Sequence, residues 1–290
     1  MSGLKILVVD GYSEEGRTQL AAWGGTVASD LYAGALRRVR GDLAIETAFP
    51  ALPDAVLPDV AALRGYDGVA WTGSSLNVYN GGPEIERQLE FCRSCFASGV
   101  PQFGSCWGLQ VAAAAAGGTV LRNPLGREMG IARKIVLTEA GRAHPLYHGR
   151  PSVFDAIAVH KDIVTALPEG TRILAWNPMA RVQAAAFTHD GGAFWGVQYH
   201  PEYTFGEIGA AMRRYAAGLV EEGLFESEQA VRRSAGIFAS FDDDGGGAAD
   251  RWLAGLDDDV LDPAERLRDL KNWLDFVEAG RRRRTGSGNS

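Results

Sequence analysis

One short segment limits the folds open to this chain, because it places Cys106 between Gly104 and Gly108 where an apolar stretch gives way to small residues. A sharp turn from strand to helix needs glycine on either side, since a side chain there would collide with the backbone. The helix expected over Leu109–Ala116 would point its free N–H groups and positive dipole end at the sulfur, which favours the thiolate. The sequence therefore predicts a nucleophile elbow built on a cysteine.

A second motif supplies a base for this nucleophile. The apolar stretch Phe194–Tyr199 is typical of a strand that ends at His200, and Pro201 prevents further sheet pairing. Side chains two residues apart on an extended segment point to the same side, so Glu202 can accept the ring N–H of His200 and fix its tautomer. The alternative is a structural histidine beside a surface glutamate, and the elbow makes that alternative the weaker one. Together the two motifs predict a Cys-His-Glu triad.

These two motifs resemble the class I glutamine amidotransferase family, whose catalytic domain carries a Gly-x-Cys-x-Gly elbow and a later His-Pro-Glu. The resemblance covers roughly residues 4 to 217, and the chain is similar to stand-alone members of the GMP synthase glutaminase type. It implies Cys106 as nucleophile, His200 as general acid and base, and Glu202 as the residue that orients His200.

The segment Ala70–Ser75 resembles the oxyanion loop of the same family. The resemblance implies that a backbone N–H near Gly73 joins that of Trp107 in holding the developing oxyanion. Many members have Gly-Gly-Pro where this chain has Thr72-Gly73-Ser74, which leaves open which amide is the donor.

Three side chains are implied on the substrate side. Gln110, four residues after the nucleophile, matches a glutamine that contacts the amino-acid end of the substrate in relatives. His160 and Asp162 lie in a stretch that matches a substrate-side segment of the family. The distal part of the substrate has no such signature, because the residues that would contact it lie on loops.

The first 220 residues alternate apolar strands with polar helical stretches, which is typical of a mainly parallel open sheet covered by helices on both faces, as in flavodoxin-like folds. In such sheets, sites form at the carboxyl ends of strands, and Gly73, Cys106 and His200 all follow a strand. Residues Glu128–Phe187 are expected to form an antiparallel extension. The expected strands are Leu4–Val9, Gly68–Trp71, Pro101–Gly104 and Phe194–Tyr199, with a helix over Glu84–Ser98.

A second region is expected from residue 221 to residue 290, after a catalytic domain of residues 1–220. It holds 16 acidic and 10 basic side chains, and so carries most of the net charge of −7. Asp242–Gly247 has the composition of a linker or loop, and Pro263–Val277 shows the apolar spacing of a helix. Arg281–Arg284 lead into a terminus expected to be disordered. A solvated tail is the preferred interpretation of these arginines over a patch for an acidic partner.

Composition excludes several classes of function. A chain of 290 residues with 46% hydrophobic content can bury one large core, and no apolar run reaches the roughly 18 residues that span a bilayer. The acidic balance argues against a nucleic-acid partner. There is neither a phosphate loop nor a dinucleotide-binding glycine motif, so no cofactor is expected. We expect a cytoplasmic enzyme acting on a small molecule.

The three cysteines are too few and too unevenly placed for a disulfide framework. Cys92 and Cys95 have redox or half-zinc spacing, but Cys92 falls on the apolar face of a helix and no further ligands lie nearby. No metal site is expected.

The triad predicts cysteine-dependent hydrolysis of a γ-glutamyl amide through a thioester on Cys106. If the leaving amine is ammonia, the family pattern requires a separate synthetase as partner. If the amine is larger, the protein is a self-sufficient hydrolase, which the absence of an acceptor domain slightly favours. The acidic tail could dock a partner or a second copy of the chain. A binding or regulatory protein with a vestigial elbow is the alternative from a different class.

Overall fold

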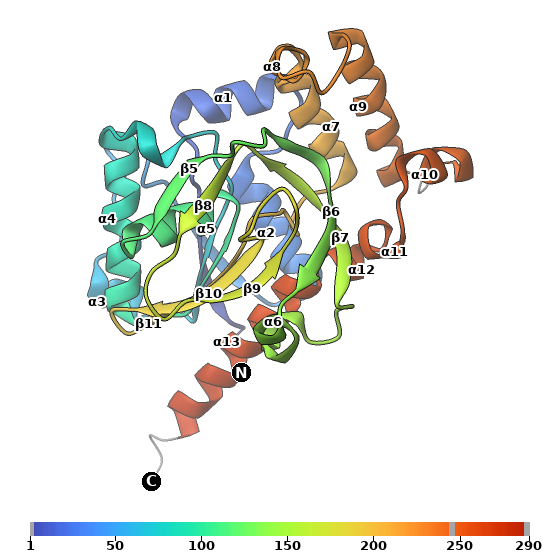
Figure 1. The fold of residues 1–290 in the computed structure, drawn as a ribbon. Helices are drawn as coiled ribbons and strands as arrows, with labels where there is room; N and C mark the ends of the chain where they lie inside the picture. The colour runs from blue at the N-terminus through green and yellow to red at the C-terminus, as the bar shows by residue number, and fades with distance from the viewer. Residues whose placement is uncertain (1–2, 244–246, 287–290) are drawn as a thin grey trace.

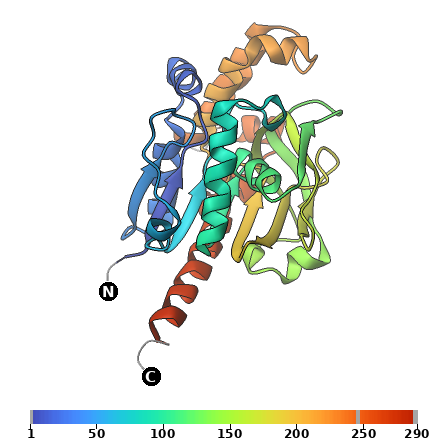
Figure 2. The same ribbon diagram turned by 90° about the vertical axis from the view of Figure 1, so that its left-hand side faces the viewer.

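The computed structural model describes residues 3–243 and 247–286, and within them a nine-stranded mixed sheet is covered by helices on both faces (Figures 1 and 2). Its strand order is β2-β1-β3-β4-β11-β10-β9-β6-β7, and β5 and β8 form a separate pair. The strands are β1 Lys5–Val9, β2 Ala44–Ala48, β3 Gly68–Trp71, β4 Gln102–Ser105, β5 Thr119–Arg122, β6 Glu128–Leu137, β7 Val153–His160, β8 Asp162–Ala166, β9 Arg172–Trp176, β10 Ala184–His189 and β11 Gly192–Val197. The helices are α1 Glu14–Ala22, α2 Ala28–Val39, α3 Val60–Leu63, α4 Pro83–Ser98, α5 Trp107–Ala115, α6 Glu139–Ala143, α7 Phe205–Arg214, α8 Ala216–Glu221, α9 Glu228–Asp243, α10 Ala248–Ala254, α11 Asp258–Leu261, α12 Pro263–Arg266 and α13 Arg268–Gly286, with short 3-10 turns at Val78–Asn80 and Pro145–Tyr147.

The sheet has a parallel half and an antiparallel half. Strands β2, β1, β3, β4 and β11 pair in parallel, whereas β10, β9, β6 and β7 continue the same sheet by antiparallel pairing. The predicted open sheet with helices on both faces is confirmed, and so is the antiparallel extension from residue 128. The triad segments all leave the carboxyl ends of the parallel half.

The central parallel strands β1 and β3 are mostly apolar because both of their faces are buried, whereas the edge strand β2 is largely exposed. On β1, Ile6 and Val8 join the core that contains α2 and α13, while Leu7 and Val9 join the core that contains α4 and α5. This alternation fixes the strand register, because a shift by one residue would exchange the two faces.

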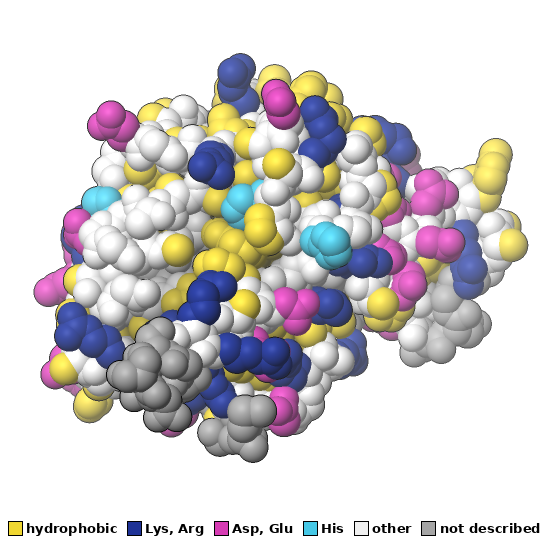
Figure 3. All heavy atoms as spheres, turned by 90° about the horizontal axis from the view of Figure 1, so that it is seen from below, with side chains coloured by type: hydrophobic (Ala, Val, Ile, Leu, Met, Phe, Trp, Pro, Cys, Tyr) yellow, Lys and Arg dark blue, Asp and Glu magenta, His cyan; other side chains and the backbone are white. Residues whose placement is uncertain are grey.

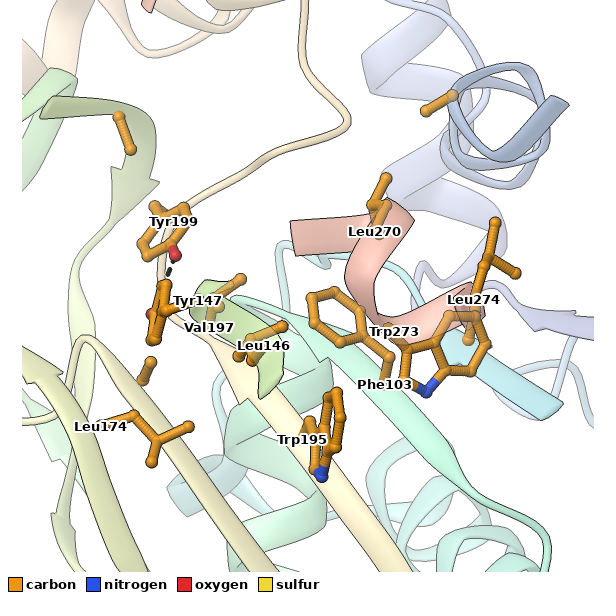
Figure 4. Packing of buried hydrophobic residues seen from close by; sticks show 14 of the residues in the cluster. Phe103, Leu146, Tyr147, Leu174, Trp195, Val197, Tyr199, Leu270, Trp273 and Leu274 are labelled. Atoms are coloured by element: carbon orange, nitrogen blue, oxygen red, sulfur yellow. Dashed lines mark hydrogen bonds between the residues drawn. The ribbon is translucent and has the colours of Figure 1, made fainter. Parts of the chain in front are cut away.

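The C-terminal helix α13 packs directly on the central sheet. Its buried side chains Leu270, Trp273 and Leu274 lie against Phe103 of β4 (Figure 4). The ring centroids of Phe103 and Trp273 are 5.8 Å apart. A Cβ added to Gly68 would lie 2.9 Å from Cζ2 of Trp273, so glycine is what lets the indole reach the sheet. The single helix expected over residues 263–277 is divided at Leu267 into α12 and α13, and the apolar side chains that pack in the core belong to α13.

Buried polar contacts join α13 to the strand that precedes His200. Asp269 is fully buried and accepts hydrogen bonds from Tyr199 Oη at 2.7 Å and from Arg150 Nη2 at 3.1 Å. Asn272 donates to the backbone oxygens of Leu146 and His148. The buried pair of Asp269 and Arg150 fixes how the helix docks, although Arg150 Nη1 has no hydrogen-bond partner among the described residues.

The expectation of a disordered arginine-rich end was wrong for Arg281–Arg284, which lie within α13. Arg281 and Arg284 reach Asp67, far upstream in the chain, and Arg282 pairs with Glu278 one turn earlier. Lys and Arg side chains gather on this face of the molecule (Figure 3). Residues 287–290 and 244–246, which fall in the expected disordered end and linker, lie outside the described residues. Across the ranges that are described, no helix is long and apolar enough to cross a membrane.

Candidate active site

Cys106 sits at a strained turn between β4 and α5. Its backbone has φ 50° and ψ −99°, a left-handed conformation that non-glycine residues rarely adopt. A Cβ on Gly104 would lie 2.6 Å from the carbonyl carbon of Gly108. A Cβ on Gly108 would lie 2.7 Å from the Cβ of Trp71. Both glycines are therefore required for strand and helix to approach this closely. The turn is held by the Cys106 N–H, which donates to Val197 O at 2.8 Å.

His200 and Glu202 meet this cysteine from the end of β11. His200 Nδ1 lies 2.7 Å from Glu202 Oε1, and both side chains are buried. Because a carboxylate only accepts, Nδ1 is the donor, which leaves Nε2 for Cys106. Cys106 lines the same cavity as His200, and its Sγ lies 3.7 Å from the backbone oxygen of Val159. The ring of Tyr203 stacks on the imidazole at 4.1 Å between centroids. The structure thus brings the three predicted triad residues together.

The environment of His200 favours its charged form. Burial by itself would lower the pKa of His200, but the charge of Glu202 and the neighbouring Cys106 raise it to about 10. At neutral pH the ring is therefore charged, and it lies beside the buried side chain of Cys106. Such a group can donate a proton to an amine as that amine departs.

Gly73 and Trp107 lie where an oxyanion could be held. A Cβ on Gly73 would lie 2.8 Å from Cε1 of His200, so this loop runs directly along the base. Trp107 is the first residue of α5, where the backbone N–H has no acceptor within its own helix. Side chains of the same loop tie it to the loop after β1: Thr72 Oγ1 accepts from Gly11 N, and Ser74 Oγ donates to Gly11 O.

Gln110 and Asp162 lie on the other side of the cysteine. Gln110 Nε2 donates to the backbone oxygen of Asp162 at 3.1 Å and to Gln198 Oε1 at 3.3 Å. The carboxylate of Asp162 accepts from Asn77 Nδ2 at 2.5 Å and from Tyr79 Oη at 3.0 Å. These bonds orient both predicted substrate-side groups at one end of the site.

His160 takes a more supporting place than the other predicted residues. Both of its ring nitrogens are engaged, Nε2 with Glu128 Oε2 at 2.8 Å and Nδ1 with Asp162 O at 3.2 Å. Burial would raise the pKa of Glu128, but hydrogen bonds from His160, Asn177 and Gln183 lower it overall. The resulting network holds the Asp162 segment in position.

A cavity of about 260 Å³ opens beside the thiol. Cys106, Gln110, His160, Asp162 and His200 line it, as expected from the sequence. It is also lined by residues of α1, β7 and α7 and of the segments that connect strands and helices, most of which no sequence motif marks. These are Tyr12, Leu20, Ser74, Ser75, Leu76, Asn77, Arg127, Val159, Lys161, Tyr203, Glu207, Ala211, Arg214 and Tyr215.

The other two cysteines belong to the core of α4. Cys92 and Cys95 are fully buried, and burial raises the pKa of both thiols. Within residues 3–243 and 247–286, no group of three or more His, Cys, Asp or Glu side chains could hold a metal ion.

Comparison with known proteins identifies the family. The model of class I glutamine amidotransferases matches residues 58–216. The chain belongs to this family. A γ-glutamyl-L-1-hydroxyisopropylamide hydrolase of Pseudomonas sp is 35% identical over 281 residues, which cover 96% of this chain and 94% of that protein. The enzyme is thus of the glutamine amidotransferase and hydrolase type.

Two further relatives show where the likeness is narrower. The GMP synthase of Leifsonia xyli subsp. xyli is 34% identical over 155 residues, which cover 53% of this chain and 29% of the synthase. A crystal structure of a glutamine amidotransferase from Thermotoga maritima shares the fold, with a TM-score of 0.64, 14% identity, and coverage of 96% of this chain and 99% of the other.

Proposed function

We propose that this protein hydrolyses the amide bond of a γ-glutamyl compound through a γ-glutamyl thioester on Cys106. One observation supports this more than any other: a cysteine on a strained elbow shares a cavity with a charged histidine that a buried glutamate orients. That arrangement pairs a nucleophile with its base and the base with its orienter.

The reaction follows from these positions. With its proton on His200, Cys106 attacks as the thiolate. Its Sγ forms a bond to the γ-carbonyl carbon, and the electron pair of the carbonyl moves to its oxygen, which the amides of Gly73 and Trp107 stabilise. As the C–N bond breaks, His200 gives its proton to the leaving nitrogen. A water molecule then loses a proton to His200 and attacks the thioester. When the C–S bond breaks, glutamate leaves, and the thiolate of Cys106 beside protonated His200 is restored.

The leaving amine is more than ammonia in this proposal. The match with the Pseudomonas hydrolase extends over 96% of the chain and so includes most of residues 221–290, whereas the match with the GMP synthase covers 53%. A relative that shares the C-terminal region and is named for a γ-glutamyl alkylamide supports a self-sufficient hydrolase. The GMP synthases support the second candidate, a glutaminase that passes ammonia to a separate synthetase.

A mass-spectrometric time course separates these candidates. The purified protein is incubated with glutamine pooled with γ-glutamyl alkylamides, including the 1-hydroxyisopropylamide. Glutamate release from an alkylamide with glutamine spared supports the hydrolase, and consumption of glutamine alone supports the glutaminase. If no substrate is turned over and Cys106 does not react with a thiol-labelling reagent, a binding protein would instead be favoured.

Two variants anchor this experiment. Cys106→Ala is expected to lose roughly 10⁴- to 10⁶-fold in kcat, and Glu202→Gln less, because members of a triad contribute unequally. The matched control is Cys92→Ala, which removes a thiol from the core of α4 and should turn over like the parent. Comparable rates for Cys106→Ala and the parent would contradict the proposed function.

A further inference from the structure

We propose that one face of α7, carrying Glu207, Ala211 and Arg214, is the subsite for the leaving amine, and that it selects a short, neutral amine bearing a hydroxyl group. This inference rests on the proposed function and goes beyond it by assigning residues and a chemical class to the amine side.

The amine must lie beside His200, because that residue delivers the proton to the leaving nitrogen. A chain of contacts leads from His200 to α7. The ring of Tyr203 stacks on the imidazole, Tyr203 and Tyr12 both line the cavity, and the guanidinium of Arg214 lies 5.8 Å from the centre of the Tyr12 ring. Gln110, which also lines the cavity, is the residue expected to contact the amino-acid end of the substrate. The α7 end of the cavity is therefore the amine end.

Three residues of α7 form one wall of the cavity at this end. Glu207, Ala211 and Arg214 are spaced by four and three residues, so they share one face of the helix, and all three line the cavity. The small side chain of Ala211 leaves room between the two charged ones. Leu20 of α1 also lines the cavity and adds an apolar surface for a short carbon chain.

The start of α7 is fixed by groups before it and beyond residue 220. Thr204 caps the helix by accepting from Glu207 N, and Asp242 of α9 accepts from the backbone N–H groups of Phe205 and Gly206. A helix held at its N-terminus in this way presents Glu207 at a defined depth in the cavity.

The charges of the wall determine which amine fits. Glu207 accepts from the backbone N–H of Thr26 at 3.1 Å and from its hydroxyl, which leaves carboxylate lone pairs unused. Arg214 donates from Nη2 to Gln19 Oε1 at 3.1 Å, and its guanidinium has further N–H groups to offer. A hydroxyl group can either donate to the Glu207 carboxylate or accept from the Arg214 guanidinium. An ammonium group would face Arg214, and a carboxylate would face Glu207.

A matched substrate series tests this selectivity. The γ-glutamyl amides of ethanolamine, propylamine, ethylenediamine and glycine present a hydroxyl, a methyl, an ammonium and a carboxylate group at the same distance from the reacting bond. We expect kcat/KM to be roughly 10-fold or more higher for the hydroxyl than for the methyl compound, and lowest for the two charged compounds. A ratio of hydroxyl to methyl near one, or a preference for either charged amine, would overturn the inference.

Two variants test the assignment of residues. Glu207→Gln should relax the exclusion of the glycine amide, and Arg214→Met should relax the exclusion of the ethylenediamine amide, each by roughly 10-fold. Arg213→Met, on the same helix but outside the cavity, should keep the selectivity of the parent. Unchanged selectivity in both cavity variants would overturn the inference. The substrate series on the parent tests it even if a variant fails to fold.

The two proposals fail in distinguishable ways. Cys106-dependent turnover of all four amides at similar rates would leave the hydrolase standing and remove the α7 subsite. Turnover of none of them by the parent would overturn both.

Discussion

The two faces of β4 are covered by helices of opposite character. On one face, α5 follows β4 through the elbow and approaches it so closely that Gly104 and Gly108 leave no room for a Cβ. On the other face, α13 arrives from more than 160 residues downstream and fills the space with the indole of Trp273. The elbow side uses tight backbone packing to place a reactive group, whereas the α13 side uses a large apolar side chain to stabilise the sheet. Substitutions on the elbow side should therefore alter kcat, and substitutions on the α13 side should alter the free energy of unfolding.

The largest expected effect is on the α13 side. Trp273→Ala empties a fully buried site against Phe103, and we expect about 3 to 5 kcal/mol of lost unfolding free energy, measured by urea denaturation. The kcat of the folded protein should change less than about threefold. Trp252→Ala is the control, because Trp252 is 80% exposed and its loss should be worth about 0.5 kcal/mol or less. A stable Trp273→Ala protein that has lost activity would reverse the comparison.

Asp269→Asn tests whether the two sides are separate. The change leaves Arg150 buried without its carboxylate, and we expect about 3 kcal/mol of destabilisation with kcat little changed. Asp275→Asn, an exposed position on the same helix, should be nearly neutral. Asp269 also binds Tyr199, the residue before His200. If kcat fell more than tenfold while KM stayed constant, α13 would position the base, and the separation of roles would not hold.

Gly108→Ala is expected to have the opposite signature. Its Cβ would lie 2.7 Å from the Cβ and 2.9 Å from the carbonyl oxygen of Trp71, so α5 must shift and carry the elbow with it. A displacement of about 1 Å at a reacting group costs on the order of 10²-fold in kcat, with a stability loss of about 1 to 3 kcal/mol from overpacking. The control is Gly34→Ala, where an added Cβ meets nothing within 4 Å. Full activity in Gly108→Ala would show that the elbow tolerates displacement.

The same contrast explains what could be predicted from the sequence. The elbow and the His-Pro-Glu segment are contiguous, and each residue type there has a local reason, such as the glycines around Cys106. Helices α4 and α5 were expected within about two residues of their observed bounds, because the signals that predict them are also local in the sequence. The apolar spacing of α13 was also visible, because helical periodicity is local.

What could not be predicted depends on contacts between distant segments. The sequence of α13 does not say that its apolar face packs on β4, nor that Asp67 meets Arg281 and Arg284 beyond the expected end of the helix. The amine end of the cavity combines residues of α1, α7 and the loop after β1, and only the folded sheet brings Tyr12 and Glu207 together. These residues have no spacing that marks them in advance.

The smallest effect is a pH dependence that reports on the elbow side alone. Although burial lowers the pKa of His200, Glu202 and Cys106 raise it from 6.5 to about 10, so the stabilisation that comes with this proton is fully present below pH 6.5 and is lost as pH rises through about 10. We expect kcat/KM to be level between about pH 7 and 9 and to fall about tenfold per unit above about 10, in a profile measured from pH 6 to 11. Glu202→Gln removes the charge that raises this pKa most, and should move the alkaline limb to lower pH, whereas Trp273→Ala should leave it in place. If the alkaline limb of the pH profile does not shift in Glu202→Gln, the carboxylate does not hold the proton on His200. If that limb shifts in Trp273→Ala, the two faces of β4 are coupled.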